Sequence, residues 1–385
     1  MESHPLFEPF LDESHRLFRE TCLRFAEQEI RPHATDWEEA ERFPRELFRK
    51  AARAGILGAL LPEAYGGGGG DMLHTFVSTE ALLRGGSSGV VAGLGSLGIA
   101  LPPLLLLGDE AQKQRFIPPV VAGERVAALG ITEPGAGSDV AGVRLRAVRK
   151  GDRYLLSGNK LFITSGAQAD LVMTLARTSD DPHGGLTFFV VEKGMKGFSA
   201  SRTLKKTGWR ASDTAELAYE EVEVPEENRV GPEGSGFRAL MQSFQTERMA
   251  LAAFGHASAE IAFEEAMTYA RERKVFGRPV TGFQVTRHKL AEMATQVTAA
   301  KSFNYLLARR IVDGAYLPRE VSMAKNFSAE VAEVVCREAV QLLGGMGYMR
   351  ETLVERLSRD VRILAIGGGT SEVMNEVIAK MLPLG

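Results

Sequence analysis

Apolar residues recur at helical spacing in the first part of the chain. In "DESHRLFRETCLRFAEQEIRPHA" they fall at Leu17, Phe18, Cys22, Phe25 and Ile30, the three-to-four spacing that places side chains on one buried face of a helix. The segment 44–61 repeats this pattern, and the five glycines at 66–70 then interrupt it, because glycine is costly inside a helix. We predict helix through residues 11–60 and further helical structure to about residue 123.

The pattern changes between residues 124 and 235. Short runs rich in β-branched and aromatic residues predict strands over 144–164, 170–178, 186–194 and 215–225. Long amphipathic segments then predict helices over 236–272, 283–312, 319–343 and 370–381, whose short connections indicate a bundle. We therefore expect an α+β protein with an N-terminal α-helical domain (1–123), a middle β-barrel-like domain (124–235) and a C-terminal four-helix bundle (236–385).

One uncharged stretch, residues 85–108, is long enough to span a bilayer. It contains seven glycines and the pair Pro102 and Pro103, so it lacks the continuous hydrophobicity of a lipid-exposed helix. Residues 93–98, "GLGSLG", match the dinucleotide-binding glycine pattern, but prolines follow within five residues and disfavour the helix which that motif needs. We expect a buried, closely packed helix that lines a cavity, and no membrane partner.

Composition excludes several classes of protein. The chain carries 46 basic and 49 acidic side chains and so presents no basic field for nucleic acid. Its two cysteines and the lack of a signal-peptide pattern favour reduced thiols in the cytoplasm. The seven histidines show no metal-ligand spacing, and there is no GxSxG motif, so we expect neither a metal site nor a serine hydrolase.

Residues 131–139, "ITEPGAGSD", carry candidate ligand groups. Their glycines allow backbone N–H groups to approach a ligand, and Thr132 and Ser138 offer hydroxyls, although a tight surface turn fits equally well. Four further motifs follow: "NKLFITSG" (159–166), "RERKVFGRPVTGFQ" (271–284), "QLLGGMGY" (341–348) and "GGGTSEV" (367–373). Together the five resemble, over essentially the whole chain, the acyl-CoA dehydrogenase family, flavoenzymes that introduce a double bond beside a CoA thioester.

The resemblance implies an FAD site. Thr132 and Ser138 would lie near the flavin and the CoA moiety, and Phe162 and Thr164 against the isoalloxazine ring, with the Thr164 hydroxyl near N5. Phe162 replaces a tryptophan of many members, which keeps an aromatic wall and removes an indole N–H. The other implied FAD-binding residues are Arg273, Phe276, Gln341 and Gly345, which in the family reach a neighbouring subunit's FAD, with Gln284, and with Thr370 and Glu372 at the subunit's own FAD. A homotetramer is therefore expected.

The position of the catalytic base departs from the common family pattern. Most members hold a glutamate in a motif like "YEGT", whereas this chain has "GGGT", with Gly368 at the base position. A minority, resembling isovaleryl-CoA and long-chain acyl-CoA dehydrogenases, holds it on the first helix of the bundle, where this chain has Glu247 followed by Arg248. Apolar flanks predict that part of this pair is buried. A structural ion pair is the alternative, but the missing glutamate at 368 favours Glu247 as the base.

The implied reaction is α,β-dehydrogenation of an acyl-CoA to the trans-2-enoyl-CoA. Glu247 would accept the α-proton, a hydride would pass to flavin N5, and the thioester oxygen would accept hydrogen bonds from the Gly368 N–H and the ribityl 2'-hydroxyl of FAD. Gly367 and Gly368 would widen the α-carbon region, Arg248 would lie beside the substrate, and the segment around Gly95 would line the acyl tail. We expect a medium- to long-chain or branched fatty acyl-CoA, and electron-transfer flavoprotein as the acceptor, as in fatty acid β-oxidation.

Two other reactions on the same fold stay open. An acyl-CoA oxidase would use the same base and pass its electrons to oxygen. A flavin monooxygenase would need no glutamate at position 247 or 368.

Overall fold

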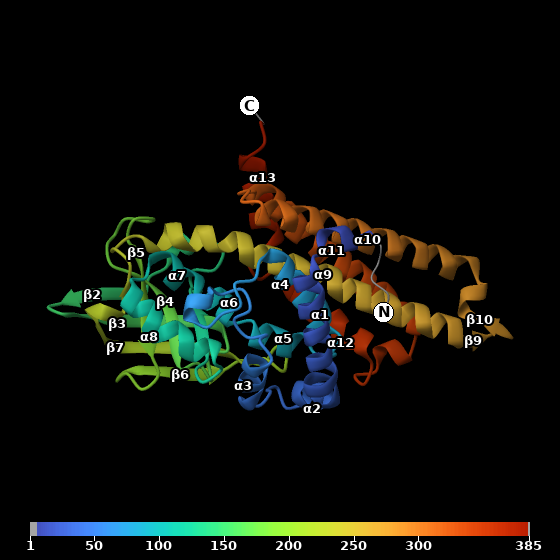
Figure 1. Ribbon diagram of the computed structural model, residues 1–385, viewed down its shortest axis with the longest axis horizontal. Coiled ribbons are helices and arrows are strands. Elements are labelled where there is room, and N and C mark those ends of the chain that lie inside the picture. Colours follow the sequence, from blue (N-terminus) through green and yellow to red (C-terminus); the bar gives the residue numbers. More distant parts are fainter. Residues whose placement is uncertain (1–5, 384–385) are drawn as a thin grey trace.

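A computed structural model describes residues 6–383 (Figure 1). The N-terminal part is helical, and its helices are α1 (Glu13–Phe25), α2 (Ala34–Glu39), α3 (Glu46–Arg53), α4 (Met72–Leu83), α5 (Ser88–Leu94), α6 (Leu97–Ala100), α7 (Pro102–Leu107) and α8 (Glu110–Val121). The helix predicted over 11–60 is interrupted. A π-helical turn at Ala26–Ile30 follows α1, and α3 ends at Arg53 because Gly55 and Gly58 adopt positive φ angles of 71° and 76°.

The single buried helix predicted within residues 85–108 is wrong, because this stretch forms the three short helices α5, α6 and α7. The chain breaks at Gly95 and Ser96, and again where Pro102 starts α7, since proline cannot continue the preceding hydrogen-bond ladder. Val90, Leu97 and Leu104 are nevertheless buried, as expected. Within residues 6–383 no single helix is long and apolar enough to cross a membrane. In this described range, the bent helix pair Ser88–Leu94 and Leu97–Leu107 is long and apolar enough when its two halves are taken together.

The middle part forms an eight-stranded sheet. Its strands are β1 (Ala127–Gly130), β2 (Arg146–Lys150), β3 (Arg153–Thr164), β4 (Leu171–Arg177), β5 (Leu186–Glu192), β6 (Phe198–Thr203), β7 (Thr214–Pro225) and β8 (Arg229–Val230). They are arranged in the order β6-β7-β3-β2-β4-β5-β8, with β1 parallel to β4. Strands β4 and β5 are each buried on both faces. One face of each strand packs in the internal core of the β domain, and the opposite face packs against the helices.

The C-terminal part contains three long helices and two shorter ones: α9 (Gly236–Glu272), α10 (Gln284–Val312), α11 (Pro318–Leu343), α12 (Leu353–Asp360) and α13 (Ser371–Lys380). A hairpin of β9 (Lys274–Val275) and β10 (Arg278–Pro279) joins α9 to α10. The four predicted helices are present, and α12 was not predicted. Figure 1 shows the hairpin at one end of the molecule and the large sheet at the other, with α9 running between them. Thus the fold class predicted from the sequence, helical then β then helical, is confirmed.

A buried pair of carboxyl groups lies where the three parts meet. Asp360, at the end of α12, accepts the N–H of Trp209, which follows β6, at 2.7 Å. Glu38, in α2, accepts the hydroxyl of Ser87 at 2.6 Å. Each carboxyl group has a second oxygen that is buried without a hydrogen-bond partner. Burial, and then the negative charge of Glu38, raise the pKa of Asp360 to about 7. A proton on Asp360 therefore stabilises this junction.

We expect Asp360→Asn to change how stability depends on pH. The folded-state pKa of Asp360 lies above the unfolded value of 3.8, so the folded protein binds more protons between about pH 4 and 7 and loses stability as the pH rises through that window. The loss is at most about 1.4 kcal/mol per pH unit for one proton. Asparagine stays neutral and should flatten this decline. Thermal unfolding midpoints between pH 5 and 7 measure this decline. The control Asp313→Asn, which removes an exposed carboxylate, should leave the wild-type slope unchanged.

Candidate functional site

The glycine turn 367–369 lies beside Glu247 of α9. A Cβ atom built on Gly368 would be 3.7 Å from Oε1 of Glu247 and only 2.4 Å from Cδ1 of Leu251, one helical turn further along α9. The fold therefore brings together two positions that are more than a hundred residues apart in sequence. Leu251 fills the space that a side chain at 368 would need, and the Glu247 carboxylate lies beside this turn.

Two cations hold the backbone of this turn. The Nε atom of Arg248 donates to the carbonyl oxygen of Gly368 at 3.4 Å, and the Nζ atom of Lys325, on α11, donates to the carbonyl oxygen of Gly369 at 2.5 Å. Gly368 and Gly369 have φ angles of 64° and 97°, in the region that favours glycine. The backbone of the turn is thus restricted to angles that favour glycine, and the carbonyl groups of Gly368 and Gly369 accept hydrogen bonds from positively charged side chains.

Burial and charge act in opposite directions on Glu247. Burial raises the pKa of Glu247, and the nearby charges of Arg248 and Lys325 lower it in part, so that the net shift is upward. Burial also lowers the pKa of Lys325 to about 8, with Arg248 acting in the same direction. A half-buried carboxylate whose pKa is raised toward neutrality can accept a proton from a weak carbon acid.

Helix α13 begins directly after the glycine turn. Thr370 is its N-cap and accepts the N–H of Val373 at 3.3 Å, while Glu372 is exposed in the first turn. The pKa of Glu372 is lowered by the hydrogen bond of its own backbone N–H and by the Thr370 hydroxyl. Gly367 is half-buried beside Ile363. The structure therefore gathers Glu247, Arg248, Gly367, Gly368, Thr370 and Glu372 around one turn.

A second group of predicted residues lies on the β sheet. The N–H of Leu161, in β3, donates to the carbonyl oxygen of Thr132 at 2.8 Å, which fixes the loop 131–139 against the strand. The register of β3 against β7 shifts between Lys160 and Ile163, and Phe162 within this bulge has a φ angle of 61° and is 63 % exposed. A bulge re-aims a side chain, so Phe162 presents its ring outward beside Thr164. Ser138 is exposed in the loop.

An ion pair that was not predicted anchors this loop. Lys160 of β3 is fully buried, and its Nζ donates to Oε1 of Glu133 at 2.9 Å and to the carbonyl oxygen of Ile131 at 2.8 Å. The other carboxylate oxygen of Glu133 accepts the N–H of Arg144 at 2.7 Å. Glu133, within "ITEPGAGSD", is therefore structural, and it positions the loop that carries Thr132 and Ser138.

A third group lies at the end of the molecule that carries the β9–β10 hairpin (Figure 1). Arg273, Phe276, Gln284, Gln341 and Gly345 are all exposed, and Phe276 is 95 % exposed at the hairpin tip with a φ angle of 49°. Helix α9 separates this end from the sheet by roughly 55 Å at 1.5 Å per residue. These residues therefore do not reach the Phe162 surface of their own chain.

Gly95, the remaining predicted residue, lies exposed at the break between α5 and α6. No residue of the turn 367–369 is within 4 Å of a Cβ built on it. The structure therefore does not bring Gly95 into the Glu247 group.

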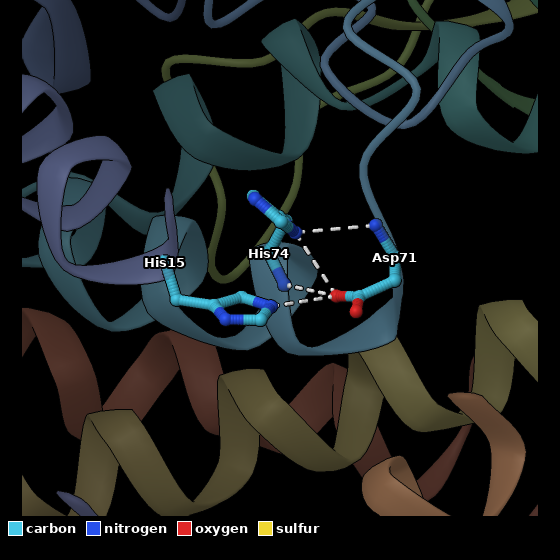
Figure 2. A group of neighbouring side chains, drawn as sticks. All are labelled: His15, Asp71 and His74. Atoms are coloured by element: carbon cyan, nitrogen blue, oxygen red, sulfur yellow. Dashed lines mark hydrogen bonds and ion pairs between the residues drawn. The ribbon is translucent and has the colours of Figure 1, made fainter. Parts of the chain in front are cut away.

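Two histidines that are far apart in sequence lie together elsewhere, in the N-terminal part (Figure 2). Oδ1 of Asp71 is 3.0 Å from Nε2 of His15 and 3.0 Å from Nδ1 of His74. Asp12 and Asp71 are the N-caps of α1 and α4, and each histidine accepts the N–H of its cap residue at 3.2 Å. Figure 2 shows both nitrogen atoms directed at the carboxylate oxygen. Reciprocal capping accounts for this cluster, which joins α1 to α4.

This combination defines a class of protein: a helix–sheet–helix fold with a half-buried carboxylate at a glycine turn and an exposed aromatic ring on a β bulge. Models of the acyl-CoA dehydrogenase family match its three parts, the N-terminal domain over residues 12–124, the middle domain over 128–222 and the C-terminal domain over 234–382. The chain belongs to the acyl-CoA dehydrogenase family, and is an FAD-dependent oxidoreductase that dehydrogenates acyl-CoA.

Curated relatives differ in the substrate for which they are named. The chain is 39 % identical over 376 residues to the mitochondrial long-chain specific acyl-CoA dehydrogenase of Mus musculus, covering 96 % of this chain and 86 % of the relative. It is also 39 % identical over 374 residues to the short-chain specific enzyme of Clostridium acetobutylicum, covering 96 % and 98 %. The isovaleryl-CoA dehydrogenase of Arabidopsis thaliana is 36 % identical over 374 residues, with coverage of 96 % and 91 %.

Solved structures show the same fold. A probable acyl CoA dehydrogenase from Mycobacterium abscessus is 48 % identical with a TM-score of 0.95, covering 96 % of this chain and 99 % of that one. A chain from a structure of the electron transferring flavoprotein of Acidaminococcus fermentans is 36 % identical with a TM-score of 0.94, covering 97 % and 99 %. A glutaryl-CoA dehydrogenase from Mycobacterium smegmatis in complex with FADH2 is 28 % identical with a TM-score of 0.92, covering 98 % and 96 %.

We expect Gly368→Ala to destabilise the protein. The new Cβ would overlap Cδ1 of Leu251, and alanine at a φ angle of 64° costs roughly 1–2 kcal/mol. The thermal unfolding midpoint should therefore fall. Gly367→Ala is the matched control, because its nearest neighbour, the carbonyl oxygen of Ile363, would be 3.5 Å away and no positive φ angle is involved. Equal midpoints for the two variants would contradict the assigned constraint.

Proposed function

We propose that Glu247 is the base that removes the α-proton of a fatty acyl-CoA. The observation that carries this proposal is the 3.7 Å separation between Oε1 of Glu247 and the position of a Cβ on Gly368. A carboxylate at this place supplies the acid–base group that the glycine at 368 lacks. Its raised pKa, which burial causes, suits proton transfer from the carbon beside a thioester.

The backbone around Gly368 supplies a second element. Removal of the α-proton leaves negative charge on the thioester oxygen, and the N–H of Gly368 is the donor that we assign to it. Such a preorganised donor contributes roughly 2.7–4 kcal/mol in comparable sites. The carbonyl groups of Gly368 and Gly369 are turned toward Arg248 and Lys325, which keeps their oxygens away from that developing charge.

The residues on the β sheet fit an isoalloxazine ring. Phe162 offers an exposed aromatic surface on the bulge, and the neighbouring Leu161 N–H binds the carbonyl oxygen of Thr132. A Cβ at Gly135 or Gly137 would meet open space, so backbone could approach a ligand there. FAD held by these residues would supply the acceptor for the hydride that leaves the β-carbon. Thr370 and Glu372, at the N-terminus of α13, would hold the same subunit's FAD.

The hairpin end supports an oligomeric site. Arg273, Phe276, Gln284, Gln341 and Gly345 are exposed and remote from the sheet of their own chain, so we assign them to the FAD of a neighbouring subunit. Within its own chain Phe276 is 95 % exposed, and its ring lies 6.4 Å from the ring of Phe283. A homotetramer is the assembly that we propose, with each cofactor held by two subunits.

The substrate that we propose is a medium- to long-chain or branched acyl-CoA. Gly367 carries no side chain, and the nearest atom to a Cβ built on it would be 3.5 Å away, which leaves room for a branched acyl chain there, whereas Leu251 occupies the space beside Gly368. Relatives of equal identity, 39 %, are named for long and for short chains, so overall similarity does not select the chain length. The presence of an electron transferring flavoprotein structure among the similar chains supports that protein as the acceptor.

The first test is an anaerobic titration that follows flavin absorbance with butyryl-, isovaleryl-, octanoyl-, palmitoyl- and citronellyl-CoA. We expect the medium-, long- or branched-chain thioesters to bleach the flavin, and Glu247→Gln to slow bleaching by at least about 100-fold while FAD stays bound. The wild-type rate should also fall as the pH drops below the raised pKa of Glu247, because a protonated carboxyl group accepts no proton.

Glu265→Gln, on the exposed face of the same helix, is the matched control and should bleach at the wild-type rate. Bleaching that survives in Glu247→Gln would overturn the base assignment. A strict short-chain preference would overturn the substrate class. Rapid reoxidation of the bleached flavin by oxygen would point instead to an acyl-CoA oxidase.

Phe276→Ala tests the shared cofactor site. Because this side chain is almost fully exposed, its removal should leave the fold intact and lower the FAD content of the purified protein. FAD content per chain and molecular mass in solution measure the two effects. Val285→Ala, an exposed apolar side chain at the start of α10, should retain full FAD content. Unchanged FAD binding in Phe276→Ala would remove the support for an intersubunit contact.

A further inference from the structure

Lys325 is a buried cation without a carboxylate partner. It is 1 % exposed on α11 and is the only charged residue between Glu320 and Glu330. Lys160 and Lys301, which are also buried, each have a carboxylate oxygen at 2.9 Å. Within the described residues no carboxylate oxygen lies within 4.0 Å of the Lys325 Nζ atom, which donates instead to the carbonyl oxygen of Gly369. Burying an ammonium group without a carboxylate partner costs free energy of folding, so we expect its charge to serve a function.

We propose that Lys325 is a positioning residue for the dehydrogenation, which fixes the glycine turn and keeps Glu247 ionised. The inference rests on the proposed role of Glu247. Lys325 reaches the turn from α11, whereas Arg248 reaches it from α9, so the two cations tie the turn to two different helices. Loss of the Lys325 contact frees the Gly369 carbonyl and lets the neighbouring Gly368 N–H change direction.

The charge of Lys325 acts on Glu247 as well. Arg248 and Lys325 are the charged groups that lower the pKa of Glu247 against the effect of burial. Glu372, on α13, stabilises the ammonium form of Lys325, and Tyr316, before α11, faces Arg248. Since the pKa of Lys325 is lowered to about 8, the ammonium charge is lost as the pH rises through that value. Glu247 then becomes harder to ionise, and the turn loses a charged donor.

Three variants separate the charge of Lys325 from its hydrogen bond. Lys325→Met removes both, Lys325→Gln keeps a donor without charge, and Lys325→Arg keeps the charge at all working pH values. The first readout needs no turnover: it is the infrared band of the protonated Glu247 carboxyl group, identified by its absence in Glu247→Gln and titrated with pH. The second is the rate of anaerobic flavin bleaching from pH 6 to 10, with FAD content measured in parallel.

We expect Lys325→Met and Lys325→Gln both to raise the titration midpoint of Glu247 by about one pH unit. Lys325→Met should also slow bleaching by about 10- to 100-fold, and Lys325→Gln by less, because a donor still reaches Gly369. In Lys325→Arg the midpoint should stay near the wild-type value, and the decline in rate above about pH 8 should move to higher pH. Lys50→Met, which removes the lysine that pairs with Glu29 in the N-terminal part, should alter neither profile.

A wild-type Glu247 midpoint in folded, FAD-loaded Lys325→Gln would overturn the proposal, as would an alkaline decline unmoved by Lys325→Arg. If Lys325→Met does not fold, these two variants decide the question. The two proposals fail separately. If Glu247→Gln still bleaches normally while the infrared midpoint shifts in Lys325→Gln, Glu247 is not the base, and the electrostatic coupling to Lys325 stands.

Discussion

The turn at residues 367–369 is the constraint around which the site is organised. It holds two successive glycines at positive φ, with their carbonyl groups bound to Arg248 and Lys325 and with Leu251 packed where a side chain at 368 would begin. Arg248 and Leu251 belong to α9, and Lys325 belongs to α11. The geometry of the turn therefore depends on the packing of α9 against α11. A side chain at 368 would displace Leu251 and hold a strained backbone, and the carboxylate beside the turn comes from α9.

A buried ionic network fixes α9 relative to its neighbours. Glu80, in α4, accepts from Nε2 of His256 in α9 at 2.8 Å and pairs with Nζ of Lys301 in α10 at 3.3 Å. Burial acts to raise the pKa of Glu80, but the charges of Lys301 and His256 outweigh it and hold the value at about 2. Lys301 also binds Glu260 at 2.9 Å. Because removing one partner of such a network leaves an uncompensated charge, these helices are held in one relative position.

Elements with a long, uninterrupted apolar periodicity were predictable. Helix α9 begins and ends at the predicted residues 236 and 272, and the buried strands β4 and β5 lie within predicted runs. The missed elements lack such a pattern. Strand β6, Phe198–Thr203, is almost entirely exposed and pairs only with β7, so no alternation of apolar residues marks it. Helix α12 spans only eight residues. The raised pKa of its Asp360 depends in part on Glu38, which is remote in sequence.

The sequence by itself determined the order of the three parts and the family resemblance, and it showed a glycine at 368 and a glutamate at 247, because residue types and spacing are written along the chain. Only the tertiary structure decided what surrounds Glu247. Lys325, Leu251 and the ion pair of Lys160 with Glu133 act through contacts between segments far apart in sequence. Their burial and charge depend on packing, and a one-dimensional pattern does not contain the distances that set a pKa or exclude a side chain.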